Sequence, residues 1–275
     1  MSFPTAAPLM VGRIAERASF LVQLMASTPN VGHIVAMGGG GFSMEPDNPL
    51  LDDFVLSLSR RQPARVCFVP TASADSAAYI VRFYRALSGR CIPTDLTLFD
   101  SASLMRRPAR TSDLAAFVAD QDVIYVGGGN TANLLALWRA HGLDVLFREA
   151  WFNSVVLSGV SAGMICWFLG GVTDSYGGLE RLDDGLGFID ATACPHYDGE
   201  PARRPTYHHL IGGGMPSGYA ADDGAALHFC GTELVEVVSS RPQAGAYRVE
   251  VSEGQVIETS LPVRFLGVGD AVAGA

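Results

Sequence analysis

Short apolar runs alternate with amphipathic segments along the first part of the chain. The runs are three to five residues long and apolar, which predicts buried strands at residues 33–37, 65–69, 95–99, 123–126 and 155–157. Between them, apolar residues recur at every third or fourth position, which predicts helices at residues 49–60, 76–87, 111–119 and 132–141. Repeated strand–helix units with short connections favour an α/β fold with a doubly wound, mostly parallel sheet and helices on both faces.

The pattern changes beyond residue 160. We expect an apolar helix at 164–169, a glycine- and aspartate-rich loop at 170–186 and a helix at 206–211. Short strands are expected at residues 188–191, within 218–229 after an acidic turn, and at 233–238, 246–251 and 256–258, with hairpin turns at Gly245 and Gly254. No shift in composition marks a boundary. Residues 31–265 are therefore expected to form a single domain, preceded by an extension at 1–30 with a short helix at 14–25.

The most informative stretch is Gly159-Val160-Ser161-Ala162-Gly163, which joins the strand at 155–157 to the apolar helix. A serine between small residues on a sharp strand-to-helix turn is typical of a nucleophile elbow. Such a turn lifts the serine hydroxyl above the carboxyl end of the strand, where doubly wound sheets form their sites. The turn also aims the Ala162 N–H and the helix N-terminus at a developing oxyanion. The structural alternative is an ordinary joint with a solvated serine.

Composition narrows the function classes. The chain has 275 residues, 48% of them hydrophobic, and a net charge of −9 without a run of Lys or Arg, which argues against nucleic acid and anionic membranes as partners. No uncharged apolar stretch reaches the ~18 residues of a membrane span. The five cysteines are dispersed without metal-ligand spacing, which predicts no metal site and a reducing, cytoplasmic location. No cofactor is expected.

A serine nucleophile needs a base, and the chain has six histidines. His196 is the best candidate because it lies in an irregular polar turn after Pro195, whereas the others fall in or at the ends of predicted helices and strands. The base in turn needs a carboxylate to orient it. Asp222 and Asp223 precede a glycine in a turn, and Asp174 and Asp198 are further candidates, so the residues alone leave the third member open.

Several motifs together resemble the peptidase E family. They are Gly127-Gly128-Gly129-Asn130-Thr131 with Asn133-Leu134-Leu135, then Ser161-Ala162-Gly163, Pro195-His196-Tyr197 and Asp223-Gly224, in the family's order. The resemblance covers about residues 33–251. It implies a flavodoxin-like fold akin to class I glutamine amidotransferase domains. The family contains aspartyl dipeptidases and the related cyanophycinases.

The resemblance also implies roles for particular residues. Ser161 is the nucleophile, His196 the base and Asp223 the acid, where the dipeptidases carry a glutamate. Gly128 or Gly129 completes the oxyanion hole with Ala162. Asn130 helps to shape that loop and is expected to contribute to substrate binding.

The predicted function is a cytoplasmic serine exopeptidase, a dipeptidase acting on short peptides through an acyl-enzyme. Alternatives on the same elbow are a cyanophycinase-like β-aspartyl peptidase and an esterase. A catalytically silent binding domain is the alternative from another class. A dinucleotide loop at residues 127–129 is disfavoured because the run is not G-x-G-x-x-G and lacks the acidic residue about 20 positions on.

Two arginines after His196 bear on specificity. Arg203 and Arg204 are expected in the loop that follows the base, where a guanidinium could pair with the side-chain carboxylate of an Asp-X dipeptide. Glu200 is expected to neutralise one of them or to bind a substrate amino terminus. The alternative without a functional role is that both arginines are solvated surface charges. The sequence leaves the preferred substrate residue open, and also leaves open whether the chain is a monomer or a homodimer.

Overall fold

The computed structural model describes residues 32–99 and 111–267. Its larger sheet has eight strands in the order β14-β11-β10-β1-β5-β4-β2-β3. These strands are β1 (His33–Met37), β2 (Arg65–Val69), β3 (Ile92–Asp95), β4 (Val123–Val126), β5 (Val156–Val160), β10 (Ala225–Cys230), β11 (Glu233–Ser239) and β14 (Val263–Phe265). Strands β1 to β5 run parallel to their neighbours in this order, and β10 is antiparallel to both β1 and β11. The expected mostly parallel sheet is confirmed.

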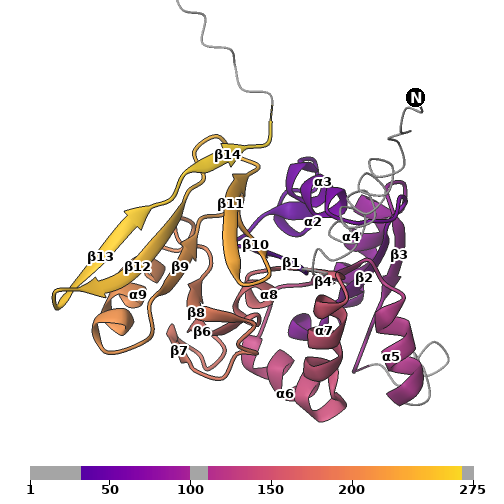
Figure 1. Cartoon of the computed structure of the whole chain (residues 1–275), viewed down its shortest axis with the longest axis horizontal. Coiled ribbons are helices and arrows are strands. Elements are labelled where there is room, and N and C mark those ends of the chain that lie inside the picture. Colours follow the sequence, from indigo (N-terminus) through magenta and orange to yellow (C-terminus); the bar gives the residue numbers. More distant parts are fainter. Residues whose placement is uncertain (1–31, 100–110, 268–275) are drawn as a thin grey trace, which may run out of the picture.

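Helices cover both faces of this sheet, as the periodicity predicts (Figure 1). On one face, side chains of the parallel strands such as Val35, Phe68 and Tyr125 pack with residues of α2 (Gly41–Met44), α3 (Leu50–Ser57) and α4 (Ala77–Leu87). On the other face, Ile34, Ile124 and their neighbours pack with α5 (Thr111–Ala119), α6 (Thr131–His141) and α7 (Leu143–Phe152). Helix α7 was not predicted from the sequence.

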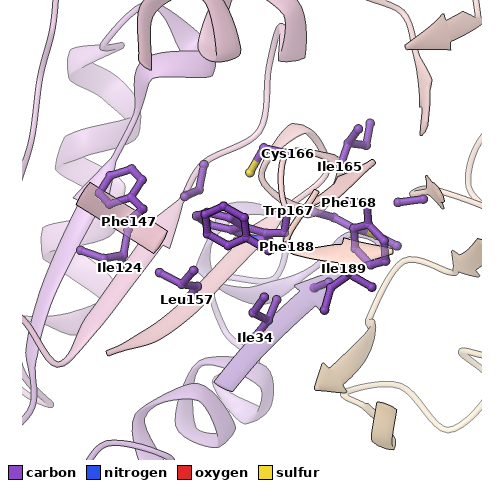
Figure 2. Packing of buried hydrophobic residues seen from close by; sticks show 14 of the residues in the cluster. Ile34, Ile124, Phe147, Leu157, Ile165, Cys166, Trp167, Phe168, Phe188 and Ile189 are labelled. Carbon is purple, nitrogen blue, oxygen red and sulfur yellow. The ribbon is translucent and has the colours of Figure 1, made fainter. Parts of the chain in front are cut away.

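A second, mixed sheet of six strands packs against the first and forms part of the same core. Its order is β13-β12-β9-β8-β6-β7. The strands are β6 (Phe168–Thr173), β7 (Glu180–Leu182), β8 (Ile189–Cys194), β9 (Gly218–Ala221), β12 (Ala246–Ser252) and β13 (Gln255–Ser260). Figure 2 shows Trp167, Phe168 and Phe188 beside Ile34 and Leu157 of the large sheet. Helix α9 (Arg203–Gly212) covers part of the second sheet with Tyr207 and Ile211.

Several predictions for the second half of the chain are wrong. The helix expected at 164–169 is only α8 (Ala162–Ile165), and β6 lies where a loop was expected. The glycines of β6 explain this, because a Cβ at Gly170 would lie 1.9 Å from the Leu182 carbonyl oxygen and one at Gly171 2.2 Å from that of Ala193. Glycine here allows close approach of neighbouring strands rather than marking a loop.

The hairpin expected at Gly245 is also absent: β11 pairs with β10 and β14, while β12 pairs with β9 and β13. The chain therefore crosses between sheets at this point. The hairpin at Gly254 is confirmed. Strand β3 begins at Ile92, earlier than the predicted 95–99, because an edge strand tolerates Pro93. The extension at 1–30, with its predicted helix, lies outside the described residues.

Candidate active site

Ser161 lies in the strained turn that the sequence predicts. It follows β5 and precedes α8 with φ 59° and ψ −110°, a conformation that non-glycine residues rarely adopt. Glycine is required on both sides, since a Cβ at Gly159 would lie 2.3 Å from the Gly163 carbonyl oxygen and one at Gly163 2.5 Å from that of Val126. The Ser161 N–H donates to the Met37 carbonyl at 3.1 Å, which ties the elbow to the neighbouring strand β1.

His196 is held in a second strained turn, after β8. Its φ is 52°, and its N–H donates to the Gly38 carbonyl at 3.2 Å. The ring Nδ1 lies 2.6 Å from Oδ1 of Asp223, and both side chains are largely buried, 14% and 13% exposed. A carboxylate at Nδ1 fixes the tautomer with its proton on Nδ1, which leaves Nε2 as a proton acceptor.

Of the four candidate carboxylates, Asp223 is the one that is hydrogen-bonded to His196. Its side chain is crowded by backbone on two sides: a Cβ at Gly39 would lie 1.9 Å from its Oδ1, and one at Gly199 2.5 Å from its Oδ2. Its N–H donates to Oδ1 of Asp198 at 2.8 Å. These contacts leave the carboxylate little freedom to turn away from the imidazole.

Asp198 supports Asp223 through the hydrogen bond just described, and Asp222 and Asp174 have different surroundings. Asp222 is buried and accepts the Gly245 N–H at 2.8 Å, and burial raises the pKa of its carboxyl. This hydrogen bond holds Gly245 in the segment where the chain passes from β11 of the large sheet to β12 of the second sheet. Asp174 is exposed and lines the pocket beside Ser161.

The glycine turn at 127–129 faces the nucleophile. A Cβ at Gly128 would lie 3.3 Å from Cβ of Ser161 and 3.8 Å from its Oγ. The Gly128 N–H donates to the Tyr79 hydroxyl at 3.3 Å, and that hydroxyl shares a 2.6 Å hydrogen bond with Ser43. Gly129 has φ 138°, and a Cβ there would lie 2.2 Å from the Ala72 carbonyl oxygen. Only glycine fits at this position.

Ala162 and Asn130 border the same region. Ala162 is the first residue of α8, and the first N–H groups of a helix have no intrahelical acceptor. Asn130 caps α6, because its Oδ1 accepts the Asn133 N–H at 2.8 Å. Its Nδ2 donates to the Ser175 carbonyl at 3.0 Å, which fixes the segment of Asp174 and Ser175 that lines the pocket.

These residues surround a pocket of about 270 Å³. Its lining is glycine and polar side chains throughout: Gly129, Asn130, Ser161, Asp174, Ser175, His196, Glu200 and Arg203. Arg203 is buried; its Nε donates to Glu200 at 2.7 Å and its Nη1 to the Val172 carbonyl at 2.8 Å. The pocket's fixed charges are two carboxylates, Asp174 and Glu200, against one guanidinium.

Arg204 does not line this pocket. Both arginines belong to α9 rather than to a loop, and adjacent helical residues point in different directions. The Arg204 guanidinium lies over the rings of Tyr197 and Tyr247, at 4.6 and 4.7 Å from their centroids, and donates to Glu258 at 3.0 Å. The sequence-based expectation that Arg204 faces the substrate therefore needs correction.

Sequence reasoning missed Tyr79, Ser43 and Ser175, which position the loops of the site. Tyr79 and Ser43 lie far in sequence from the motifs, Ser175 lies in the segment predicted to be a loop, and none of the three carries a local signal of its own. Among the described residues, no group of three or more His, Cys, Asp or Glu side chains could hold a metal ion. No helix in the described ranges is long and apolar enough to cross a membrane.

The fold and the site together define an α/β protein with serine, histidine and carboxylate side chains gathered at the carboxyl ends of its strands. The sequence profile of Peptidase family S51 matches residues 34–237. The chain belongs to this family, the peptidase E family, and the resemblance noted in the sequence is confirmed.

A sequence relative and two solved structures are similar to the chain. "Uncharacterized peptidase YgaJ" of Bacillus subtilis (strain 168) is 56% identical over 236 residues, covering 85% of this chain and 99% of the relative. A putative peptidase E protein from Listeria monocytogenes EGD-e is 19% identical, covering 84% of this chain and 100% of that one, with a TM-score of 0.54. A peptidase from an acI-B1 actinobacterium is 18% identical, covering 84% and 97%, with a TM-score of 0.59. The two structures share the fold.

Proposed function

We propose that this peptidase is a serine exopeptidase that cleaves short peptides with Ser161, His196 and Asp223. The observation that carries the proposal is the 2.6 Å contact between His196 Nδ1 and Asp223, in a pocket that Ser161 also lines from a strained turn. This is the set of groups that a Ser-His-Asp mechanism requires.

The mechanism follows from the positions of these groups. The Ser161 Oγ attacks the carbonyl carbon of the scissile peptide while Nε2 of His196 takes the hydroxyl proton. Asp223 accepts the Nδ1–H and stabilises the imidazolium. The tetrahedral intermediate then collapses: the C–N bond breaks, and His196 gives its proton to the leaving amine. Water hydrolyses the resulting ester by the same steps in reverse order, which restores the serine.

The oxyanion of the tetrahedral intermediate needs N–H donors at a fixed position. Ala162 supplies one from the start of α8. Because the Gly128 N–H is occupied by Tyr79, we assign the second donor to Gly129. Gly128 then contributes space beside the nucleophile, because a Cβ at this position would lie 3.3 Å from Cβ of Ser161.

The pocket favours cleavage near the end of a peptide over cleavage within a long polypeptide. It is small and polar, and Asn130 holds the segment of Asp174 and Ser175 in its lining. The carboxylates of Asp174 and Glu200 suit the ammonium group of a free amino terminus. Large apolar side chains find no apolar surface in the lining, so short peptides beginning with small or polar residues fit best.

Arg203 is the residue that bears on cleavage of Asp-X dipeptides. Glu200 and the Val172 carbonyl use its Nε and Nη1, two of the three guanidinium nitrogens, and Nη2 is assigned to a substrate carboxylate. The two pocket carboxylates oppose this preference, so we expect Asp-X peptides to be accepted but not exclusively. A cyanophycinase-like β-aspartyl peptidase or an esterase would use the same nucleophile and is distinguished by substrate.

A panel of dipeptides, β-aspartyl peptides and short esters tests the proposal. Ser161→Ala should lower kcat/KM for peptides by about 10⁴-fold or more with the unfolding temperature nearly unchanged, because one hydroxyl is removed. Ser88→Ala, at an exposed hydroxyl on the end of α4, is the matched control and should retain full activity. Near-normal hydrolysis by Ser161→Ala would contradict the proposal, and so would a wild-type chain that cleaves nothing in the panel, as a silent binding domain would behave.

A further inference from the structure

Among the described residues, no strand pairs with the outer edge of the strand that ends the second sheet. Strand β13 is the outermost strand of its sheet, pairs with β12, and lies in yellow at the side of the molecule in Figure 1. Its first five residues alternate between exposed and half-buried positions, and the sixth, Ser260, is exposed. Proteins usually protect such edges with lysine, proline or a bulge. Strand β13 contains neither lysine nor proline, and its pairing with β12 runs without a register shift.

The other three sheet edges in the described part of the chain are shorter and carry such protection. Strand β7 has three residues and begins with the exposed pair Glu180 and Arg181. Strand β14 also has three residues, with Arg264 at its centre. Strand β3 has four residues and contains Pro93. Strand β13 is therefore the longest of the four edges and the one most open to further pairing.

The turn before β13 fixes which of its backbone groups point outward. Glu253 and Gly254 have φ 52° and 78°, and Ser252 pairs with Gln255. Positive φ at both central residues is the type I′ hairpin turn, whose flanking residues form a hydrogen-bonded pair. Hydrogen-bonded and non-hydrogen-bonded pairs then alternate along the ladder. The N–H and C=O groups of Val256, Glu258 and Ser260 consequently point away from β12.

The single charge on β13 is already neutralised. Oε2 of Glu258 accepts from the Tyr197 hydroxyl at 2.6 Å and lies 2.8 Å from Nε2 of His208, and Oε1 accepts from Arg204 at 3.0 Å. These contacts keep the Glu258 carboxylate on the side of α9, where it is 17% exposed. The opposite side of the strand presents Gln255, Ile257 and Thr259, all uncharged and exposed.

We propose that β13 pairs with β13 of a second copy of this chain, antiparallel about a twofold axis at Ile257. In this register Val256 lies opposite Glu258 of the partner subunit, so the outward backbone groups of each copy meet those of the other. Ile257, 43% exposed in one copy, meets its own equivalent in a non-hydrogen-bonded pair with Cα atoms about 4.5 Å apart. Gln255 lies opposite Thr259 of the partner subunit. The two sheets become one, with six strands from each copy.

The register is set by charge and by side-chain contact. Centring the axis on Glu258 instead would also align the outward backbone groups, but it would place two carboxylates directly opposite each other, which is unfavourable. With Ile257 at the centre, two exposed apolar side chains cover one another. The twofold axis is then perpendicular to the sheet, so the two α9 helices lie on the same face.

Sedimentation equilibrium of the full chain tests the proposal, with substitutions at Ile257. The wild type should be a dimer, and Ile257→Lys and Ile257→Glu should each raise the dimer Kd by about tenfold or more, because each sets like charges opposite one another. An equimolar mixture of the two variants should recover the dimer through a Lys–Glu pair. Val251→Lys is the matched control: Val251 is 48% exposed on the inner strand β12 and should leave the dimer intact.

Cross-linking checks the register independently. Ile257→Cys should form a covalent dimer on mild oxidation, since the expected Cα separation suits a disulfide, and mass spectrometry should find residue 257 joined to itself. Val251→Cys should not cross-link. Three results would each overturn the proposal. The wild type could be a monomer at all concentrations, the Ile257→Lys dimer could be as tight as that of the wild type, or Val251→Lys could weaken the dimer as much as Ile257→Lys does.

Discussion

Replacing Asp223 by asparagine removes one charge at the centre of the proposed triad. The carboxylate lies 2.6 Å from His196 Nδ1 and is 13% exposed, so solvent screens it little. Opposite charges about 4 Å apart at an effective dielectric constant of about 20 attract by about 4 kcal/mol. Because about 1.4 kcal/mol of barrier is tenfold in rate, loss of imidazolium stabilisation alone should lower kcat about a thousandfold.

The asparagine amide has a second effect. An NH₂ group facing Nδ1 favours the tautomer with the proton on Nε2, which cannot accept the Ser161 proton; in the Ser-His-Asp template this substitution costs about 10⁴-fold. We therefore expect kcat/KM for Asp223→Asn to fall by about 10³- to 10⁴-fold. The assay is steady-state hydrolysis of the best dipeptide, with the unfolding temperature measured in parallel to detect misfolding.

Two carboxylates serve as controls for Asp223→Asn. Asp174→Asn should change KM more than kcat, because Asp174 lines the pocket where the substrate binds, whereas Asp223 contacts the His196 imidazole. Asp222→Asn should act mainly on stability, because its carboxylate accepts the Gly245 N–H. Activity within tenfold of wild type for Asp223→Asn, or a larger loss for Asp174→Asn, would refute the assignment of the acid.

Two further predictions concern specificity and pH. Arg203→Ala should raise KM for Asp-X dipeptides more than for Ala-X or Leu-X, while Arg204→Ala should leave this ratio unchanged; an equal effect on all substrates would remove Arg203 from substrate recognition. Burial lowers the pKa values of His33 and His228 below 6.5, and the two rings are hydrogen-bonded at 3.0 Å. The unfolded chain therefore takes up these protons first, and the unfolding free energy should fall as pH drops below about 6.5. Denaturant titrations should show a shallower fall for His228→Asn; an unchanged slope would contradict this.

The sequence predicts the large sheet well and the second sheet poorly, for a physical reason. Strands of the parallel sheet are buried on both faces, so their apolar runs stand out from the amphipathic helices between them. The glycines of β6 resemble a loop in sequence, although they serve close packing. The glycine at 245 resembles a hairpin turn, although β11 and β12 belong to different sheets. Such pairings depend on contacts between distant segments.

Some features of the candidate site could also be predicted from the sequence, and others could not. Ser161, His196 and Asp223 each lie in a tight turn after a strand: Ser161 after β5 of the large sheet, and the other two after the parallel neighbours β8 and β9 of the second sheet. The motifs named all three as candidates, but the residues alone left the choice of carboxylate open. The choice between Arg203 and Arg204 needed the orientation of α9. The role of Tyr79 needed the packing of α4 on the glycine loop, a contact over 49 residues.

The central claim is that Ser161 is the nucleophile. A peptidyl phosphonate reacts covalently with an activated serine, and mass spectrometry of the labelled, digested protein locates the adduct. We predict stoichiometric labelling at Ser161 in the wild type, strong slowing in Asp223→Asn and no labelling in Ser161→Ala. Labelling at another residue, or none in a wild type that hydrolyses peptides, would contradict the account.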